Sequence, residues 1–156
     1  VINRSGKKFD VIAGTATAGI PHAAWIADKL SLPLIYVRSS AKEHGKGNQI
    51  EGKLSKKQKV AVIEDLISTG GSSSSTVLAI REAGGVASHI FAIITYGMKK
   101  SKEAFKTNSI KLNPLTDFTT VAWMASKEGY IKPHEQKIVL KWAEDPPSWG
   151  KFMGFE

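Results

Sequence analysis

The segment 60–72 constrains the fold of this chain more than any other part of the sequence. A β-branched run, 59–63, overlaps the start of this segment and is of the kind that forms a buried strand in a parallel sheet. Two adjacent acids, Glu64 and Asp65, follow the run, and small hydroxylated residues and glycines fill 68–72. A helical pattern comes next, at 73–83. The segment therefore predicts a strand, a loop and a helix of an α/β fold.

The composition of this loop also points to a ligand. Backbone N–H groups and hydroxyls at a helix N-terminus can surround a phosphate, and the two acids can accept hydrogen bonds from hydroxyl groups. A ribose 5-phosphate has both kinds of group. The alternative is an ordinary turn with a serine N-cap and turn glycines. Because a purely structural strand end rarely needs two acids, Glu64 and Asp65 favour the ligand site.

Length and composition predict one domain that spans residues 1–156. The chain is 42% hydrophobic, which is enough for one α/β core, and it has no internal repeat. No stretch of 18 apolar residues occurs, so we expect no membrane span, and the start has no signal-peptide pattern. Cysteine is absent, which excludes disulfides and thiolate metal sites and fits a cytoplasmic enzyme.

The net charge of +8 favours anionic ligands such as phosphates or nucleic acid. The lysines gather in three clusters, at 38–46, 53–59 and 99–106, and the last two are typical of solvated surface. No aromatic residues alternate with these lysines as a platform for stacked bases requires. We therefore expect no nucleic-acid partner.

Strand patterns alternate with helix patterns along most of the chain. We expect strands at 9–13, 33–37, 59–63, 86–96 and 109–112, and helices at 21–30, 73–83, 99–107, 116–129 and 134–144. This order predicts a mostly parallel, twisted sheet flanked by helices, with a helical annex at the C-terminal end.

Ligands of such sheets bind outside the carboxyl ends of the strands, where the loops 14–19, 38–52 and 64–72 should meet. The loop 38–52 is long, polar and rich in glycine, as active-site loops often are. Its alternative is a basic, solvated loop. Beside an anion site, Arg38, Lys42 and His44 become candidate ligands for a second phosphate group.

Three segments resemble a known family. Residues 60–72 resemble the phosphoribosyl-pyrophosphate (PRPP) signature of the type I phosphoribosyltransferases. Residues 9–23 and 36–52 are similar to orotate phosphoribosyltransferases of the Gram-positive bacterial form, and so are 115–118 and 144–147. The resemblance covers essentially the whole chain and implies the type I phosphoribosyltransferase fold. Family members also have an N-terminal hood segment, which we expect this chain to lack.

The resemblance implies transfer of a phosphoribosyl group from PRPP to orotate, giving orotidine 5′-monophosphate and pyrophosphate in pyrimidine synthesis. It implies Mg²⁺ held by PRPP and water, with no direct protein ligand. It also implies a homodimer in which the loop 38–52 serves the neighbouring subunit.

The resemblance carries roles to individual residues. Lys42, His44, Glu64 and Asp65 are the expected catalytic residues, and Ser68 is the expected orotate contact. The expected PRPP contacts are Arg38, Lys42, His44, Glu64, Asp65, Leu66, Ile67, Ser68, Thr69, Gly70, Gly71 and Ser72. Three family roles are not carried over, because Ser39, Thr17–Ala18 and Gly97–Met98 depart from the residues that some members have there.

Two alternatives remain. One is a purine phosphoribosyltransferase, which shares the PRPP signature but not typically the run Lys42-Glu-His-Gly45. The other is a regulator of the same fold that senses PRPP and binds nucleic acid. A regulator has no need for leaving-group chemistry, so the intact Glu64, Asp65, Lys42 and His44 favour the enzyme.

Overall fold

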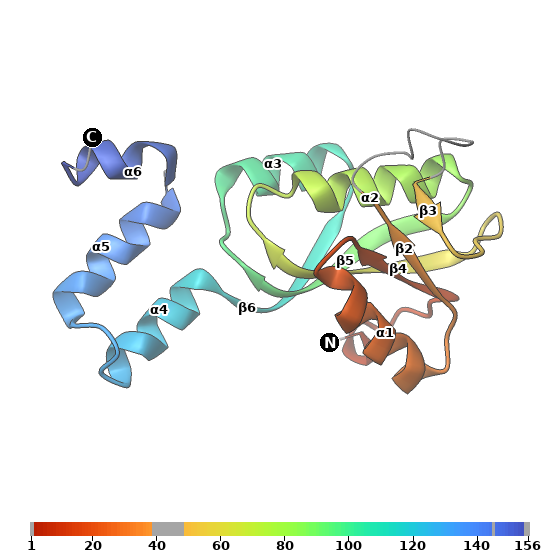
Figure 1. The fold of residues 1–156 in the computed structure, drawn as a ribbon, viewed down its shortest axis with the longest axis horizontal. Coiled ribbons are helices and arrows are strands. Elements are labelled where there is room, and N and C mark those ends of the chain that lie inside the picture. The colour runs from red at the N-terminus through yellow and green to blue at the C-terminus, as the bar shows by residue number, and fades with distance from the viewer. Residues whose placement is uncertain (1, 39–48, 145, 155–156) are drawn as a thin grey trace.

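The computed structural model describes residues 2–38, 49–144 and 146–154. Figure 1 shows a twisted sheet with helices on its faces and a helical segment that extends away from it. The strands are β1 (Val11–Thr15), β2 (Leu34–Val37), β3 (Ile50–Glu51), β4 (Lys59–Ile67), β5 (Val86–Thr95) and β6 (Lys111–Asp117). The helices are a short 3-10 turn (Asn3–Ser5), α1 (Gly19–Leu30), α2 (Gly71–Glu82), α3 (Lys99–Thr107), α4 (Phe118–Lys127), α5 (Pro133–Glu144) and α6 (Pro146–Phe152).

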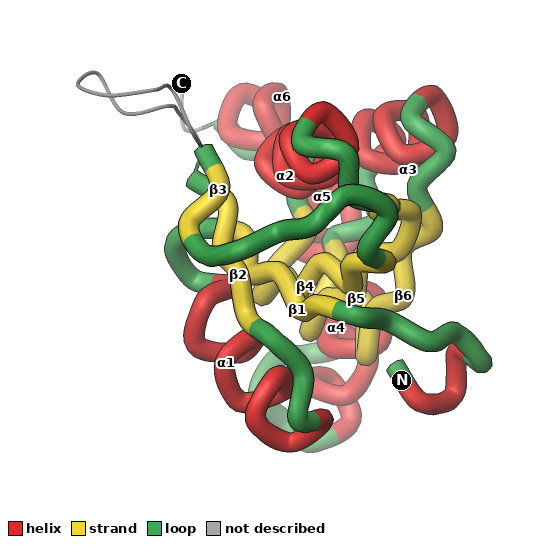
Figure 2. Tube along the Cα trace, turned by 90° about the vertical axis from the view of Figure 1, so that its right-hand side faces the viewer, coloured by secondary structure: helices red, strands yellow, loops and turns green. Residues whose placement is uncertain are grey.

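The six strands form one sheet in the order β3-β2-β1-β4-β5-β6. Every neighbouring pair is parallel except β2 and β3, which pair antiparallel at one edge. In Figure 2 helix α1 covers one face of the sheet, and helices α2 and α3 cover the other. The predicted mostly parallel sheet with helices on both faces is therefore confirmed.

Residues 11–13 of β1 and 60–63 of β4 are apolar and buried, because helices cover both faces of the sheet here. Side chains that alternate along these strands enter two separate clusters. The cluster on the α2 face includes Val11, Ala13, Val60, Val62 and Val77. The cluster under α1 includes Ile12, Ala23, Ala61, Ile63 and Phe91. Together the two clusters fix the register of β1 against β4.

Several predicted boundaries are wrong. β4 continues to Ile67, four residues past the apolar run, because it stays paired with the long strand β5 as far as Ile67 opposite Thr95. Helix α2 begins at Gly71 rather than at residue 73, and β6 spans seven residues where a short strand was expected. The sequence pattern did not indicate β3 or α6. The predicted helix 99–107 is confirmed.

Helices α4, α5 and α6 form the predicted helical annex beyond β6 (Figure 1). An aromatic cluster joins this annex to the sheet. The ring of Tyr96, just after β5, lies 5.3 Å from that of Phe118 and 5.1 Å from that of Trp142, centroid to centroid. No helix in the described part of the chain is long and apolar enough to cross a membrane.

Candidate active site

The site lies where the strand order of the sheet reverses. The chain leaves β1 through α1 toward β2 on one side, and it leaves β4 through α2 toward β5 on the other. The carboxyl ends of β1 and β4 are therefore adjacent, with the start of one helix above each of them. Such a switch point is the usual ligand position in open α/β sheets.

Glu64 is a buried acid at this point. Glu64 is only 5% exposed to solvent, and the Ser73 hydroxyl donates a 2.7 Å hydrogen bond to its Oε2 atom. Burial raises the pKa of Glu64 to about 7, mainly because desolvation disfavours the charged form; the Ser73 bond opposes this shift and the neighbouring Asp65 adds to it. The carboxyl group therefore changes its charge close to neutral pH.

Both predicted acids lie inside β4 rather than at its end, which corrects the prediction of a strand that stops at residue 63. Glu64 pairs with Ala92 of β5 in the ladder. Asp65 is half-buried, whereas Glu64 is buried. The two acids therefore differ in their exposure to solvent.

The loop after β4 and the first turn of α2 contain the predicted phosphate site. Gly70 is the N-cap of α2 and has a left-handed backbone (φ 76°), and no side chain caps the helix. Thr69 and Ser72 are exposed, and Ser68 is half-buried. In the described part of the chain the N-cap thus offers the first backbone N–H groups of α2 no side-chain acceptor, which suits an anion at this end of the helix dipole.

Helix α3 supports this loop from behind. A Cβ atom added at Gly70 would lie 2.9 Å from Cζ of Phe105 and 3.2 Å from Cβ of Ser101. The backbone N–H of Tyr96 donates to the carbonyl of Ile67, which holds the start of the loop against the end of β5. Packing and hydrogen bonding therefore both fix the loop.

Arg38 follows β2 and is separated from β4 by β1. Its backbone N–H donates to the carbonyl of Gln49, and its Nε atom lies 4.0 Å from Oε1 of Glu51. Lys42 and His44 lie outside the described residues. The structure therefore brings together Glu64, Asp65 and the residues 66–72 on one strand-loop-helix unit, and it places Arg38 at the end of β2, on the far side of β1 from that unit.

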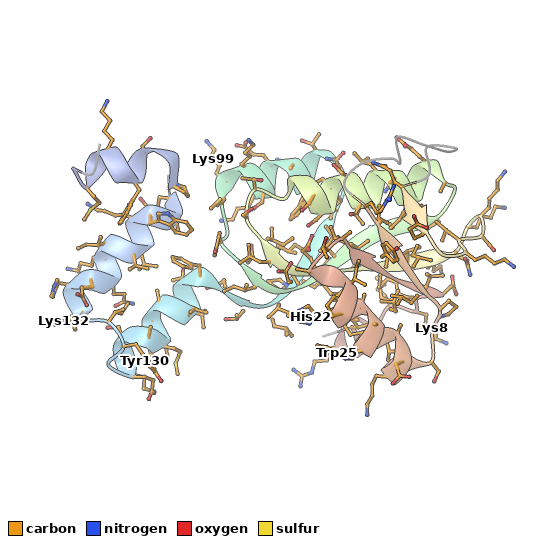
Figure 3. All side chains as sticks on the ribbon, in the orientation of Figure 1. Lys8, His22, Trp25, Lys99, Tyr130 and Lys132 are labelled. Carbon is orange, nitrogen blue, oxygen red and sulfur yellow. The ribbon has the colours of Figure 1, made fainter. Side chains whose placement is uncertain are left out.

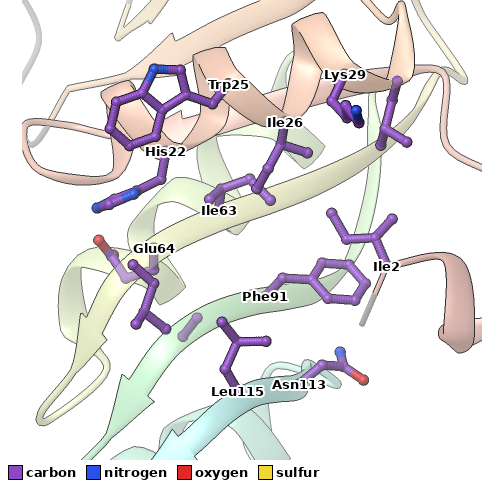
Figure 4. Close-up of a pocket in the computed structure, with 13 residues that line it drawn as sticks. Ile2, His22, Trp25, Ile26, Lys29, Ile63, Glu64, Phe91, Asn113 and Leu115 are labelled. Atoms are coloured by element: carbon purple, nitrogen blue, oxygen red, sulfur yellow. The ribbon is translucent and has the colours of Figure 1, made fainter.

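A cavity of about 420 Å³ adjoins Glu64 on the α1 face of the sheet, as Figure 4 shows. Helix α1 contributes His22, Trp25, Ile26 and Lys29 to its wall. In Figure 3 the side chains of His22 and Trp25 both project outward from this helix. The sequence pattern did not indicate these residues as part of the site. Their spacing of three, four and seven residues, typical of one helix face, is the signal that could have identified them.

The carboxyl group of Glu64 lies at one end of this cavity, close to the His22 side chain in Figure 4. The opposite wall includes the apolar side chains of Phe91 and Leu115, with Asn113 beside them. Trp25 remains 68% exposed and Leu115 65% exposed. The cavity thus combines an open apolar surface with one buried acid.

A profile of the phosphoribosyl transferase domain family matches residues 1–122 of this chain. The chain is 52% identical over 150 residues to the orotate phosphoribosyltransferase of Listeria monocytogenes serotype 4b (strain F2365), a match that covers 96% of this chain and 72% of the relative. Both matches include the strands β1 and β4 and the loops that follow them.

Solved structures also match. The orotate phosphoribosyltransferase of Aeropyrum pernix aligns with a TM-score of 0.69 and 29% identity, over 80% of this chain and 67% of that one. The Mycobacterium tuberculosis H37Rv orotate phosphoribosyltransferase, solved in complex with PRPP, aligns with a TM-score of 0.58 and 21% identity, over 73% of this chain and 66% of that one. The second match supports the fold alone.

Proposed function

The chain belongs to the orotate phosphoribosyltransferase family, and from this membership we propose that it transfers the 5-phosphoribosyl group of PRPP to orotate. The products are orotidine 5′-monophosphate and pyrophosphate, as in pyrimidine biosynthesis. One structural observation carries the proposal: the acids Glu64 and Asp65 lead directly into the uncapped start of α2 at the switch point of the sheet.

The bond changes of the reaction define what the site must do. A ring nitrogen of orotate forms a bond to the anomeric carbon of the ribose, and the bond from that carbon to pyrophosphate breaks, with the electron pair leaving on pyrophosphate. Positive charge develops on the ribose ring during this exchange. Carboxylates held beside the ring stabilise that charge, and this is the role we assign to Glu64 and Asp65.

Each end of PRPP has its own binding group in this proposal. The 5-phosphate binds the backbone and hydroxyls of residues 68–72 at the start of α2, which fixes the position of the ribose ring. Arg38, with Lys42 and His44, neutralises the pyrophosphate. Ser68, half-buried in the loop, contacts orotate.

Magnesium is part of this proposal, held by phosphate and ribose oxygens and by water. The described residues contain no group of three or more His, Cys, Asp or Glu side chains that could hold the ion, and the proposal assigns it no direct protein ligand. Mg²⁺ commonly binds through substrate phosphates and keeps several waters. When bound, it reduces the negative charge of the pyrophosphate.

We further propose that the protein works in the cytoplasm as a homodimer in which the loop 38–52 reaches the neighbouring site. We also propose that residues 1–156 act as one phosphoribosyltransferase domain. The aromatic contact of Trp142 with Tyr96 supports the inclusion of the annex in that domain.

A base panel tests the activity directly. The protein is incubated with PRPP and Mg²⁺ and with orotate, adenine or hypoxanthine, and pyrophosphate release is measured. We expect release with orotate alone. Release only with a purine would support a purine phosphoribosyltransferase instead, and absence of release combined with binding of labelled RNA or DNA would support the regulator.

A further inference from the structure

The proposed reaction assigns no role to the hydroxyl of Ser73. Ser73 is the third residue of α2, directly after the loop 68–72. It is fully buried, and its hydroxyl donates to Oε2 of Glu64 at 2.7 Å. By contrast, Ser72 and Ser75 on the same helix are exposed.

We propose that Ser73 is a positioning residue, which holds the Glu64 carboxylate in the orientation that receives the ribose hydroxyls of PRPP. This inference rests on the proposed function, because it assumes that the ribose binds beside β4. In this proposal the first turn of α2 has two functions, because it binds the 5-phosphate and also orients Glu64.

Glu64 has neighbours besides Ser73, because the hydroxyl of Thr15 in β1 and the side chain of Asp65 also interact with its carboxyl group. Its Oε1 atom points toward the start of α1, since a Cβ atom added at Gly19 would lie 3.5 Å from it. The same added atom would lie 2.7 Å from the carbonyl oxygen of Ile63, so only glycine lets α1 approach so closely. With Oε2 bonded to Ser73 and Oε1 facing the start of α1, we place the ligand hydroxyls on the Oε1 side of the carboxyl group, where Glu64 lines the cavity.

The charge of Glu64 supports the same role. The hydroxyls of Ser73 and, to a smaller extent, Thr15 of β1 favour the ionised form of Glu64, whereas burial and Asp65 favour the neutral form. From α1, His22 and Lys29 line the same cavity, and α2 contributes the neutral Ser73. Since an ionised carboxylate accepts hydrogen bonds and a neutral one also donates, Ser73 helps to keep Glu64 in the accepting form at neutral pH.

Binding and turnover of a Ser73→Ala variant test the inference, with Ser75→Ala as the matched control on the exposed side of the helix. We expect Ser73→Ala to weaken PRPP binding in the presence of Mg²⁺, measured by calorimetry, by about tenfold, because a hydrogen bond to a charged group is lost. In the pH profile of kcat/KM for PRPP, we expect the midpoint of the acidic limb to rise by about half a pH unit or more in this variant. Ser75→Ala should match the wild type in both measurements.

A direct titration separates positioning from a merely structural contribution. The pKa of Glu64, followed by carboxyl ¹³C NMR in glutamate-labelled protein, should rise in Ser73→Ala, and the kcat/KM limb should move with it. An unchanged pKa, or a raised pKa with unchanged PRPP binding and an unchanged limb, would overturn the inference. If the wild type binds PRPP but transfers nothing to orotate, the proposed function fails. The ratio of PRPP affinities between the wild type and Ser73→Ala, together with the NMR titration, then still decides the role of Ser73.

Discussion

At the scale of single residues, the two adjacent acids of β4 have different environments and should respond differently to substitution. Glu64 is buried and bonded to Ser73, whereas Asp65 is half-buried. Removal of charge from Asp65 therefore tests chemistry more than folding, and removal of charge from Glu64 tests both.

Asp65→Asn should keep the fold and lower turnover of PRPP and orotate by at least about tenfold, the equivalent of about 1.4 kcal/mol of transition-state stabilisation. The physical reason is the loss of a negative charge beside the developing positive charge on the ribose. Steady-state kinetics measure the effect, and circular dichroism checks the fold. A folded variant with near-normal kcat would contradict the assigned role.

Glu64 should make stability depend on pH. Because its folded pKa is about 7 and the ordinary value is 4.5, the folded state holds the proton more tightly than the unfolded chain between these values. The free energy of unfolding should therefore fall as the pH rises from about 4.5 to about 7, by on the order of 2 kcal/mol from this group.

Urea denaturation of the wild type and Glu64→Gln across this pH range measures the effect. The variant should lose this part of the pH dependence, since it has no proton to release. Glu82→Gln, at the exposed end of α2, serves as the control and should retain the wild-type slope. Equal slopes for wild type and Glu64→Gln would exclude a raised pKa.

At the scale of elements, the loop between β4 and α2 is shaped by its packing against α3. Gly70 meets two constraints there, a left-handed backbone and contact with Phe105. Gly129 also has a left-handed backbone (φ 77°), but nothing lies within 4 Å of an added Cβ atom. The two glycines therefore separate backbone strain from packing.

Gly70→Ala should lower the free energy of unfolding by more than Gly129→Ala, for which the left-handed conformation alone costs about 1–2 kcal/mol. It should also weaken PRPP binding, because relief of the clash with Phe105 moves the loop. Chemical denaturation and calorimetry measure the two effects. Equal losses of stability in the two variants would show that α3 does not constrain the loop.

At the scale of the whole molecule, the proposed dimer predicts complementation between two inactive variants. If the loop 38–52 serves the neighbouring site, a heterodimer of Lys42→Ala and Asp65→Asn has one site with both residues intact. Random mixing should then restore roughly a quarter of wild-type activity, because half of the dimers are mixed and each contributes one of two sites.

The measurement is turnover after the two variants are mixed and subunit exchange is demonstrated by mass-tagged subunits. Each variant alone, carried through the same exchange, is the control. No recovery after proven exchange would mean that Lys42 acts within its own subunit.

The local pattern of this chain determined the type of most elements and the identity of the central unit. The apolar run before Glu64, the glycines and serines of 68–72 and the periodicity of α2 are all local signals, and the structure joins them into one strand, loop and helix. The resemblance of the same segment placed the chain in its family. These features follow from the order of residues alone, because β-strand and helix periodicity is a property of neighbouring positions.

Tertiary structure decided the rest. The length of β4 depends on its pairing with β5, the burial of Glu64 depends on α2 above it, and the cavity beside it exists because α1 covers only part of its face of the sheet. No local sequence signal indicates these features. In the sequence, Ser73 is one of four consecutive serines, and His22 is one polar residue of a helix. Long-range contacts assign the roles of such residues, because their burial and their partners depend on chain segments far away in the sequence.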